Sequence, residues 1–285
     1  MIRADRFKED GWGDVKNAVW DTYMPPFRIL ENLYFVGTKP ASAHLIDTGD
    51  GLILLDSGYQ QTLYLILDSI RELGFSPYDI RYLLLTHGHI DHLGAARAIQ
   101  EMTGCKTILG RGDEDYATGK RDLTFAAELG MERPAVFVPD ILLDDGDTVR
   151  LGNTCIHCIH TPGHTEGTMS FFFDIEHNGT PVRAGMHGGA GMNSMQKAFL
   201  ESHGLPLSLR DDFRKGLQRL RGEHVDLFIG NHQNQCDTIG KYRRIAAGEE
   251  EAFIDAAAWP AFLDACETQL DAMLRMEQDR EEGRV

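Results

Sequence analysis

The chain has 285 residues, of which 42% are hydrophobic and 25% are charged. This is an ordinary globular composition in a chain long enough to bury a sizeable core, so it excludes a disordered chain and a disulfide-stapled miniprotein. The formal net charge of −16 disfavours binding to nucleic acids and to anionic membranes, whose surfaces are also negative.

The first half of the chain alternates strands with helices. Apolar runs predict strands at 27–37, 43–47, 52–56, 81–86 and 106–109. Apolar side chains at helical spacing predict helices at 60–73 and 95–102, which stop at Gly74 and Gly104. Residues 112–139 mix glycine, proline and short helical pieces, and no element is assigned to them.

The second half repeats this order. Strands are predicted at 148–151, 154–160, 168–175, 181–184 and 225–229, and Asn178-Gly179 suits a hairpin turn. A helix is predicted at 207–220, followed by a mostly helical extension from about residue 249 to 276. We expect Pro260 to kink this extension or to break it into two helices.

The two similar halves predict an α/β fold, an αββα sandwich of two mixed β-sheets with helices on the outer faces. We find no clean linker and expect a single domain over residues 1–285. Residues 1–20 are charged and carry no apolar core of signal-peptide length, and the chain has no apolar run that could span a bilayer. With five cysteines and no disulfide-like spacing, a cytoplasmic protein with reduced thiols is expected.

Four potential metal ligands lie within six residues of one loop. This loop reads Thr86-His87-Gly88-His89-Ile90-Asp91-His92 and joins a buried strand to a helix. Imidazole and carboxylate groups are the side chains that hold zinc and similar cations. An incidental polar turn rarely collects so many of them, so we interpret the loop as the centre of a metal site.

One loop cannot surround two ions, so further ligands must come from elsewhere. His164 follows a predicted strand and a Pro-Gly turn, in the segment Thr161-Pro162-Gly163-His164. His232 follows another predicted strand, in Ile229-Gly230-Asn231-His232. Functional groups gather in the loops at the carboxyl ends of such strands, so both histidines are candidate partners.

These motifs resemble those of the metallo-β-lactamase superfamily of αββα metallohydrolases over roughly residues 27–239. The resemblance rests on Leu54-Leu55-Asp56-Ser57-Gly58, the H-x-H-x-D-H cluster, residues 161–167 and the strand that ends at His232. It implies a first metal held by His87, His89 and His164, and a second metal held by Asp91, His92 and His232. It also implies that Asp56 orients one ligand imidazole from behind, as such sites require.

The chain departs from most of the superfamily at one position. An Asp that bridges both metals usually follows the hairpin after the T-P-G-H segment, but residues 182–189 contain neither Asp nor Cys. The pattern of glyoxalase-II-like thioesterases, many lactone hydrolases and phosphodiesterases is therefore not met. The third subclass of metallo-β-lactamases also lacks this bridge, and its ligand set matches the one here. Its members bind the drug carboxylate through nearby serines, where this chain has Gly188, Gly189 and Gly191.

His187 lies where the missing bridge would come from. It could be an additional metal ligand, a substrate contact or an ordinary loop histidine, and the sequence does not choose among these roles. Residues 112–139 and the glycine loop at 188–191 are expected to form the rim of the pocket.

Imidazole ligands leave such a centre positively charged, which lowers the pKa of a bound water from 15.7 to about 7. We therefore expect a binuclear zinc hydrolase, with iron or manganese as alternative metals. A metal-bound hydroxide, oriented by Asp91, would attack a carbonyl of a small-molecule substrate: a β-lactam-like amide, a lactone or another ester. The alternatives are a small phosphodiester or thioester hydrolase, a mononuclear iron persulfide oxygenase of the same fold, and a non-catalytic metal-binding member. The oligomeric state stays open.

Overall fold

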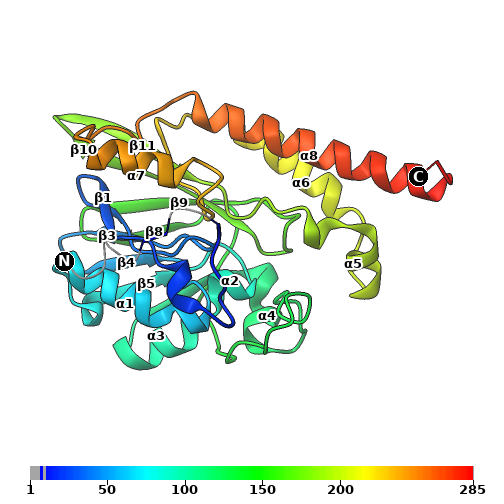
Figure 1. Ribbon diagram of the computed structural model, residues 1–285, viewed down its shortest axis with the longest axis horizontal. Coiled ribbons are helices and arrows are strands. Elements are labelled where there is room, and N and C mark those ends of the chain that lie inside the picture. Colours follow the sequence, from blue (N-terminus) through cyan, green and yellow to red (C-terminus); the bar gives the residue numbers. More distant parts are fainter. Residues whose placement is uncertain (1–6, 9–10, 285) are drawn as a thin grey trace.

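The computed structural model describes residues 7–8 and 11–284, and two β-sheets form its centre (Figure 1). The first sheet has seven strands in the order β1 to β7, antiparallel from β1 to β4 and parallel from β4 to β7. Its strands are β1 (Phe27–Leu30), β2 (Leu33–Phe35), β3 (His44–Asp47), β4 (Leu52–Leu55), β5 (Ile80–Leu84), β6 (Lys106–Gly110) and β7 (Ile141–Leu143).

The second sheet has five strands in the order β12-β11-β10-β9-β8. All neighbours in it are antiparallel except β11 and β12, which run parallel. Its strands are β8 (Thr148–Leu151), β9 (Thr154–His160), β10 (Met169–His177), β11 (Thr180–Met186) and β12 (Leu227–Phe228). Both sheets are therefore mixed, as predicted.

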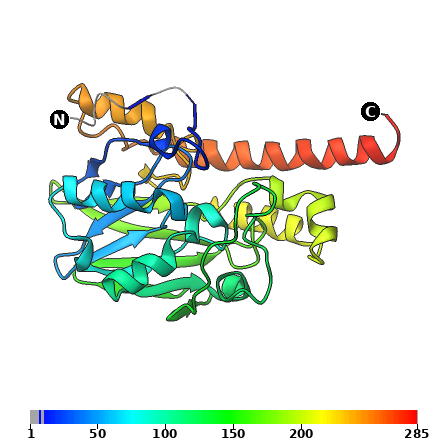
Figure 2. The same ribbon diagram turned by 60° about the horizontal axis from the view of Figure 1, so that its bottom comes forward.

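Helices cover the outer face of each sheet (Figures 1 and 2). The helices α1 and α3 pack on the first sheet, whereas α6 and the first half of α8 pack on the second. The second half of α8 extends beyond the sheets alongside α5 and α6. The described helices are α1 (Leu63–Glu72), α2 (Ile90–Leu93), α3 (Ala96–Thr103), α4 (Glu114–Thr118), α5 (Lys197–Ser202), α6 (Leu209–Leu220), α7 (Thr238–Ala246) and α8 (Ala258–Glu281).

Apolar side chains alternate between the two faces of the first sheet and form one apolar layer on each face. In β4, Ile53 and Leu55 face the second sheet, while Leu52 and Leu54 face helices α1 and α3. Successive strand side chains point to opposite faces, so a strand of consecutive apolar residues can serve both layers. This arrangement confirms the predicted αββα sandwich. The single domain over residues 1–285 stays a prediction, since residues 1–6, 9–10 and 285 lie outside the described part.

Two predicted elements were wrong in detail. The strand predicted at 27–37 is a hairpin of β1 and β2, whose turn at Glu31 (φ 43°) and Asn32 contains no glycine or proline to mark it. The extension is not helical before Ala258, because Ile254 instead pairs with Leu227 of β12. Pro260 neither breaks nor divides α8, since it lies in the first helical turn, where its missing N–H has no intrahelical partner to lose.

The remaining sequence predictions concern the thiols and the membrane. The five cysteines are all free thiols, and Cys155 and Cys158 lie on β9, where their three-residue spacing places them on opposite faces. Within residues 7–8 and 11–284, no helix combines the length and the apolar character needed to cross a bilayer.

Candidate metal centre

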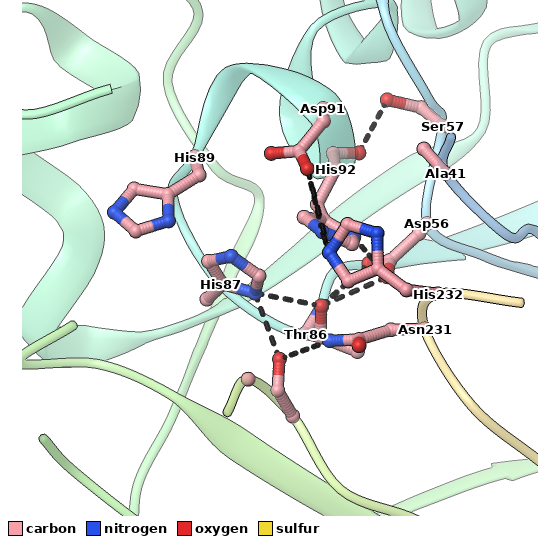
Figure 3. A network of polar contacts seen from close by, with 12 residues as sticks. Ala41, Asp56, Ser57, Thr86, His87, His89, Asp91, His92, Asn231 and His232 are labelled. Atoms are coloured by element: carbon pink, nitrogen blue, oxygen red, sulfur yellow. Dashed lines mark hydrogen bonds and ion pairs between the residues drawn. The ribbon is translucent and has the colours of Figure 1, made fainter. Parts of the chain in front are cut away.

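The candidate ligands come from loops that follow β5, β9 and β12, with Asp56 directly after β4. Figure 3 shows Asp56 together with the candidate ligands of the first and last of these loops. The loop after β5 carries His87 and His89 and continues into α2, which holds Asp91 and His92. The loops after β9 and β12 bring His164 and His232 to the same place. The structure thus gathers all six predicted ligands from three separate turns.

The first three histidines form one tight group. The Nδ1 atom of His89 lies 3.0 Å from Nε2 of His164, which in turn lies 3.2 Å from Nε2 of His87. These three ligand atoms lie within 4.8 Å of one another. All three side chains are largely buried.

The second group consists of Asp91, His92 and His232. The Nε2 atoms of His92 and His232 are 3.3 Å apart, and Oδ2 of Asp91 lies 3.3 Å from the former and 3.5 Å from the latter. His87 joins the two groups, since its ligand atom also lies within 4.8 Å of those of Asp91 and His92. Two adjacent sets of donors therefore share one pocket.

The spacing of these atoms fits tetrahedral metal coordination. A tetrahedral set of nitrogens at about 2.0–2.1 Å from zinc has neighbouring nitrogens about 3.3 Å apart. The measured separations of 3.0, 3.2 and 3.3 Å are close to that value. Imidazoles with a carboxylate are also the donor set that zinc prefers, so the residues present fit the metal.

Four of the five candidate ligand histidines are held in place by a hydrogen bond at Nδ1, the ring nitrogen that points away from the site. The Nδ1 atoms of His87, His164 and His232 face the backbone carbonyls of Gly188, Gly191 and Pro40 at 2.7, 2.8 and 2.7 Å, respectively. The Nδ1 atom of His92 faces Oδ2 of Asp56 at 2.8 Å. In the neutral form that binds metal, an acceptor at Nδ1 fixes the proton there and leaves the lone pair of Nε2 directed into the site.

Asp56 has the position expected from the sequence resemblance. It is fully buried, its Oδ2 contacts His92, and its Oδ1 accepts hydrogen bonds from the backbone N–H (2.7 Å) and hydroxyl (3.0 Å) of Thr86. Its φ of 61° lies in the left-handed region, which a non-glycine residue adopts at a cost. This conformation turns the chain sharply after β4 and directs the carboxylate toward the ligand loop.

Burial sets the protonation of the first group. It lowers the pKa values of His87 and His89 well below the usual range and that of His164 to about 4, so these imidazoles are neutral and able to bind metal. Burial would also lower the pKa of His92, but the carboxylates of Asp91 and Asp56 outweigh it and raise this pKa. Burial likewise opposes ionisation of Asp91, yet the neighbouring histidines hold its pKa well below the usual value.

The glycine loop packs against a ligand as well as forming the rim of the pocket. A Cβ atom at Gly189 would lie 2.3 Å from Cδ2 of His164, so only glycine permits the imidazole its position. The nearby hydroxyl of Ser194 donates a hydrogen bond to the backbone carbonyl of His164 at 2.7 Å and is buried. The serine closest to the glycine loop in sequence therefore supports a ligand.

His187 belongs to neither of the two donor groups. Its ring packs against Phe213 and Phe262, with centroid distances of 5.9 and 5.6 Å, and its Nδ1 accepts a hydrogen bond from the N–H of Gly189 at 3.1 Å. Burial lowers its pKa to about 3, so it is a neutral core imidazole.

A cavity of about 1190 Å³ adjoins the second group. His232 lines it together with Gly191 and with apolar side chains that include Trp12, Tyr59 and Leu129. The indole of Trp12 is 44% exposed and lies edge-on to the imidazole of His232, at a centroid distance of 6.5 Å. The expected rim thus includes Leu129 and Gly191, and the N-terminal segment adds a wall that sequence reasoning missed.

Sequence reasoning also missed two polar residues behind the ligands. Asn231 donates through Nδ2 to the carbonyl of Gly188 at 2.8 Å, the same carbonyl that faces His87. Asp113 lies in the segment left unassigned and accepts a hydrogen bond from the N–H of Gly88 at 2.7 Å. Asn231 directly precedes a candidate ligand, which was a usable signal, whereas nothing in the sequence places Asp113 near the site.

Comparisons with known proteins agree with this geometry. The family model of the metallo-beta-lactamase superfamily matches residues 36–177. An uncharacterized protein of Mycobacterium bovis is 33% identical over 157 residues, which cover 53% of this chain and 63% of that protein. The hydroxyacylglutathione hydrolase GloC of Haemophilus influenzae is 29% identical over 183 residues, or 63% of this chain and 79% of GloC.

Solved structures resemble almost the whole chain. The class B3 di-zinc metallo-beta-lactamase LRA-12 from an Alaskan soil metagenome superposes with a TM-score of 0.80 at 28% identity, covering 92% of this chain and 98% of LRA-12. In sequence, by contrast, the match to the mycobacterial relative spans less than two thirds of that relative's length. Fold, site geometry and these matches agree: the chain belongs to the metallo-beta-lactamase superfamily.

Proposed function

We propose that this protein is a binuclear zinc hydrolase that adds water to the carbonyl carbon of a small ester, lactone or β-lactam-like amide. One observation carries this proposal: six side chains from three turns direct their lone pairs into two adjacent donor sets. His87, His89 and His164 would hold one ion, and Asp91, His92 and His232 the other. Zinc bound there would supply a hydroxide nucleophile near neutral pH and polarise the substrate carbonyl.

Asp91 is the one carboxylate among these six residues. It stays ionised because the surrounding histidines lower its pKa against the effect of burial. Its Oδ2 faces His92 and His232, and its side chain keeps 16% of its surface exposed. The carboxylate can therefore accept a hydrogen bond from the attacking water and orient it toward the substrate, which is the catalytic role that we assign to it.

The cavity supports an uncharged, partly apolar substrate. Of the two cations that line it, Arg244 is paired with Glu249, and the ammonium of Lys241 is buried 5.0 Å from the ring centroid of Phe253. The charge of Arg244 is therefore paired, and the Lys241 ammonium has no hydrogen-bond partner among the described residues but is buried out of contact with solvent. The hydroxyl of Ser194 is engaged by His164. The apolar wall that includes Trp12 instead suits an alkyl or aryl group.

The comparisons favour two particular substrate classes. β-Lactams are favoured by the likeness to a class B3 di-zinc metallo-beta-lactamase. Thioesters are favoured by the partial match to a hydroxyacylglutathione hydrolase, although the chain lacks an Asp at the bridging position. Small phosphodiesters and persulfides are weaker alternatives. A cytoplasmic location and the absence of nucleic-acid and membrane partners also remain proposals.

Metal analysis followed by a substrate screen tests the proposal. Full-length protein loaded with excess metal and desalted should retain two zinc ions per chain; a single iron would instead favour the persulfide oxygenase. The screen compares uncharged aryl esters and lactones with β-lactams, S-acyl thioesters and phosphodiesters. We expect the highest kcat/KM for an uncharged ester or lactone. A protein that retains no metal and hydrolyses none of these compounds would exclude the proposed function.

A further inference from the structure

Among the described residues, only two carboxylate residues are fully buried, namely Asp56 and Asp113. Asp56 contacts a candidate ligand directly. Asp113 ends a short 3-10 helix (Arg111–Asp113) after β6 and contacts no ligand side chain. Burying a charged group is costly unless hydrogen bonds compensate for the lost water, so the position of Asp113 requires a reason.

The carboxylate of Asp113 joins the two segments that carry the first group of histidines. Its Oδ2 accepts a hydrogen bond from the N–H of Gly88 at 2.7 Å, between His87 and His89. The same oxygen accepts one from the hydroxyl of Thr165 at 2.7 Å, directly after His164. Its Oδ1 accepts one from the N–H of Gly167 at 2.7 Å. One side chain thus bonds both segments at their ligand positions.

Close backbone packing surrounds this contact. A Cβ atom at Gly167 would lie 2.4 Å from the backbone nitrogen of Asp113, and one at Gly88 would lie 2.6 Å from Cδ2 of Tyr116. Glycine at both positions lets the segments approach until the carboxylate reaches all three donors. The ligand atoms that must meet across these segments are those of His89 and His164, at 3.0 Å, and of His87 and His164, at 3.2 Å.

We propose that Asp113 is a positioning residue that sets the spacing of His87, His89 and His164 and thereby the metal affinity of the first site. This inference rests on the proposed metal-binding function. Burial raises the pKa of the Asp113 carboxyl to about 7, against the three hydrogen bonds that favour ionisation. In its ionised form it has only acceptors and meets three donors, which suits the task. An amide at the same place would turn an NH₂ group toward an N–H or O–H donor, which would separate the two segments.

The test is a zinc titration of metal-stripped, full-length protein against a competing chelator, with Asp113→Asn as the main variant. His89→Ala and His232→Ala identify which affinity belongs to which site. Asp140→Asn is the control, because the more exposed Asp140 carboxylate also accepts a backbone N–H and hydroxyl, but from Thr107, which is not part of a ligand loop. We expect Asp113→Asn to weaken the first site about 10- to 100-fold and to change the second less than about threefold.

A purely structural role predicts a different pattern. Asp113→Asn and Asp140→Asn would then both lower the melting temperature, and both would bind zinc like the wild type, which would overturn the inference. If Asp113→Asn does not fold, Thr165→Val and Thr165→Ser decide, since only the serine keeps the donated hydroxyl. Equal first-site affinity in these two variants also overturns the inference. A wild-type protein that binds no zinc instead overturns the proposed function.

Discussion

The Asp56→Asn variant tests how the second metal site is held. The backbone conformation does not oppose the change, because asparagine tolerates the left-handed region that Asp56 occupies at φ 61°. Oδ1 of Asp56 accepts a hydrogen bond from the backbone N–H of Thr86 at 2.7 Å, so the carbonyl oxygen of an asparagine would remain there. The hydroxyl of Thr86 lies within hydrogen-bond distance of both carboxylate oxygens and can donate to the one that remains. The NH₂ group of the asparagine would then face Nδ1 of His92, where the carboxylate now lies at 2.8 Å.

This exchange reverses the hydrogen bond at His92. The imidazole would have to accept at Nδ1 and would carry its proton on Nε2, the atom that faces the site. A protonated Nε2 cannot bind a metal. Loss of a partner behind a ligand histidine typically reduces metal affinity by 10- to 100-fold, or about 1.4–2.7 kcal/mol. We expect at least this loss at the site of Asp91, His92 and His232, and little change at the other site.

The assay is a competitive zinc titration of the variant beside the wild type and Asp140→Asn. Asp140 is a control for the hydrogen-bond pattern alone, because its more exposed carboxylate accepts the N–H and hydroxyl of Thr107 as that of Asp56 accepts those of Thr86. Thermal unfolding of the metal-free proteins reports any general loss of stability. If Asp56→Asn binds two zinc ions with wild-type affinities, the reasoning about the His92 tautomer is wrong.

Three further predictions concern the same centre. His89→Ala and Asp91→Ala should each lose hydrolysis by several orders of magnitude while circular dichroism shows a folded protein; unchanged rates would remove the proposed mechanism. Zinc binding at the second site near pH 6, below the pKa of about 7 of a zinc-bound water, should release about one proton, because the raised pKa keeps His92 protonated without metal. The neutral imidazoles of the first site should release none. Calorimetry in two buffers of different ionisation enthalpy measures this proton, and the second-site affinity should fall as the pH is lowered; pH-independent affinity would contradict the assignment. Trp12→Ala should raise KM for aryl esters by roughly two- to tenfold, as expected for the loss of an aromatic contact of about 0.5–1.5 kcal/mol, with kcat nearly unchanged. An equal KM in wild type and variant would show that the indole does not contact the substrate.

The sequence allowed prediction of those parts whose physics is local. Alternating apolar residues predicted β8 (148–151) and β9 (154–160) to the residue, and Asn178-Gly179 predicted the hairpin turn between β10 and β11. The turn at Glu31 and α7 (238–246) were missed. The former has no glycine or proline, and the latter has few apolar positions, so neither gives a clear local signal.

The candidate site divides in the same way. The cluster from His87 to His92 could be recognised because four residues of metal-ligand type lie within six positions of the sequence. Asp113 could not, since its significance depends on Gly88 and Thr165 meeting it across separate loops. Such contacts are set by the tertiary fold.

The acceptors behind His87, His164 and His232 are main-chain oxygens, not side chains. Every amino acid carries the same oxygen, so an alanine substitution at Pro40 leaves the acceptor chemically intact and can report only shifts in its position. Deleting or inserting one residue in these loops would instead move the oxygen itself. Libraries of point substitutions will therefore underestimate how strongly these loops constrain the site, whereas short insertions and deletions will reveal it.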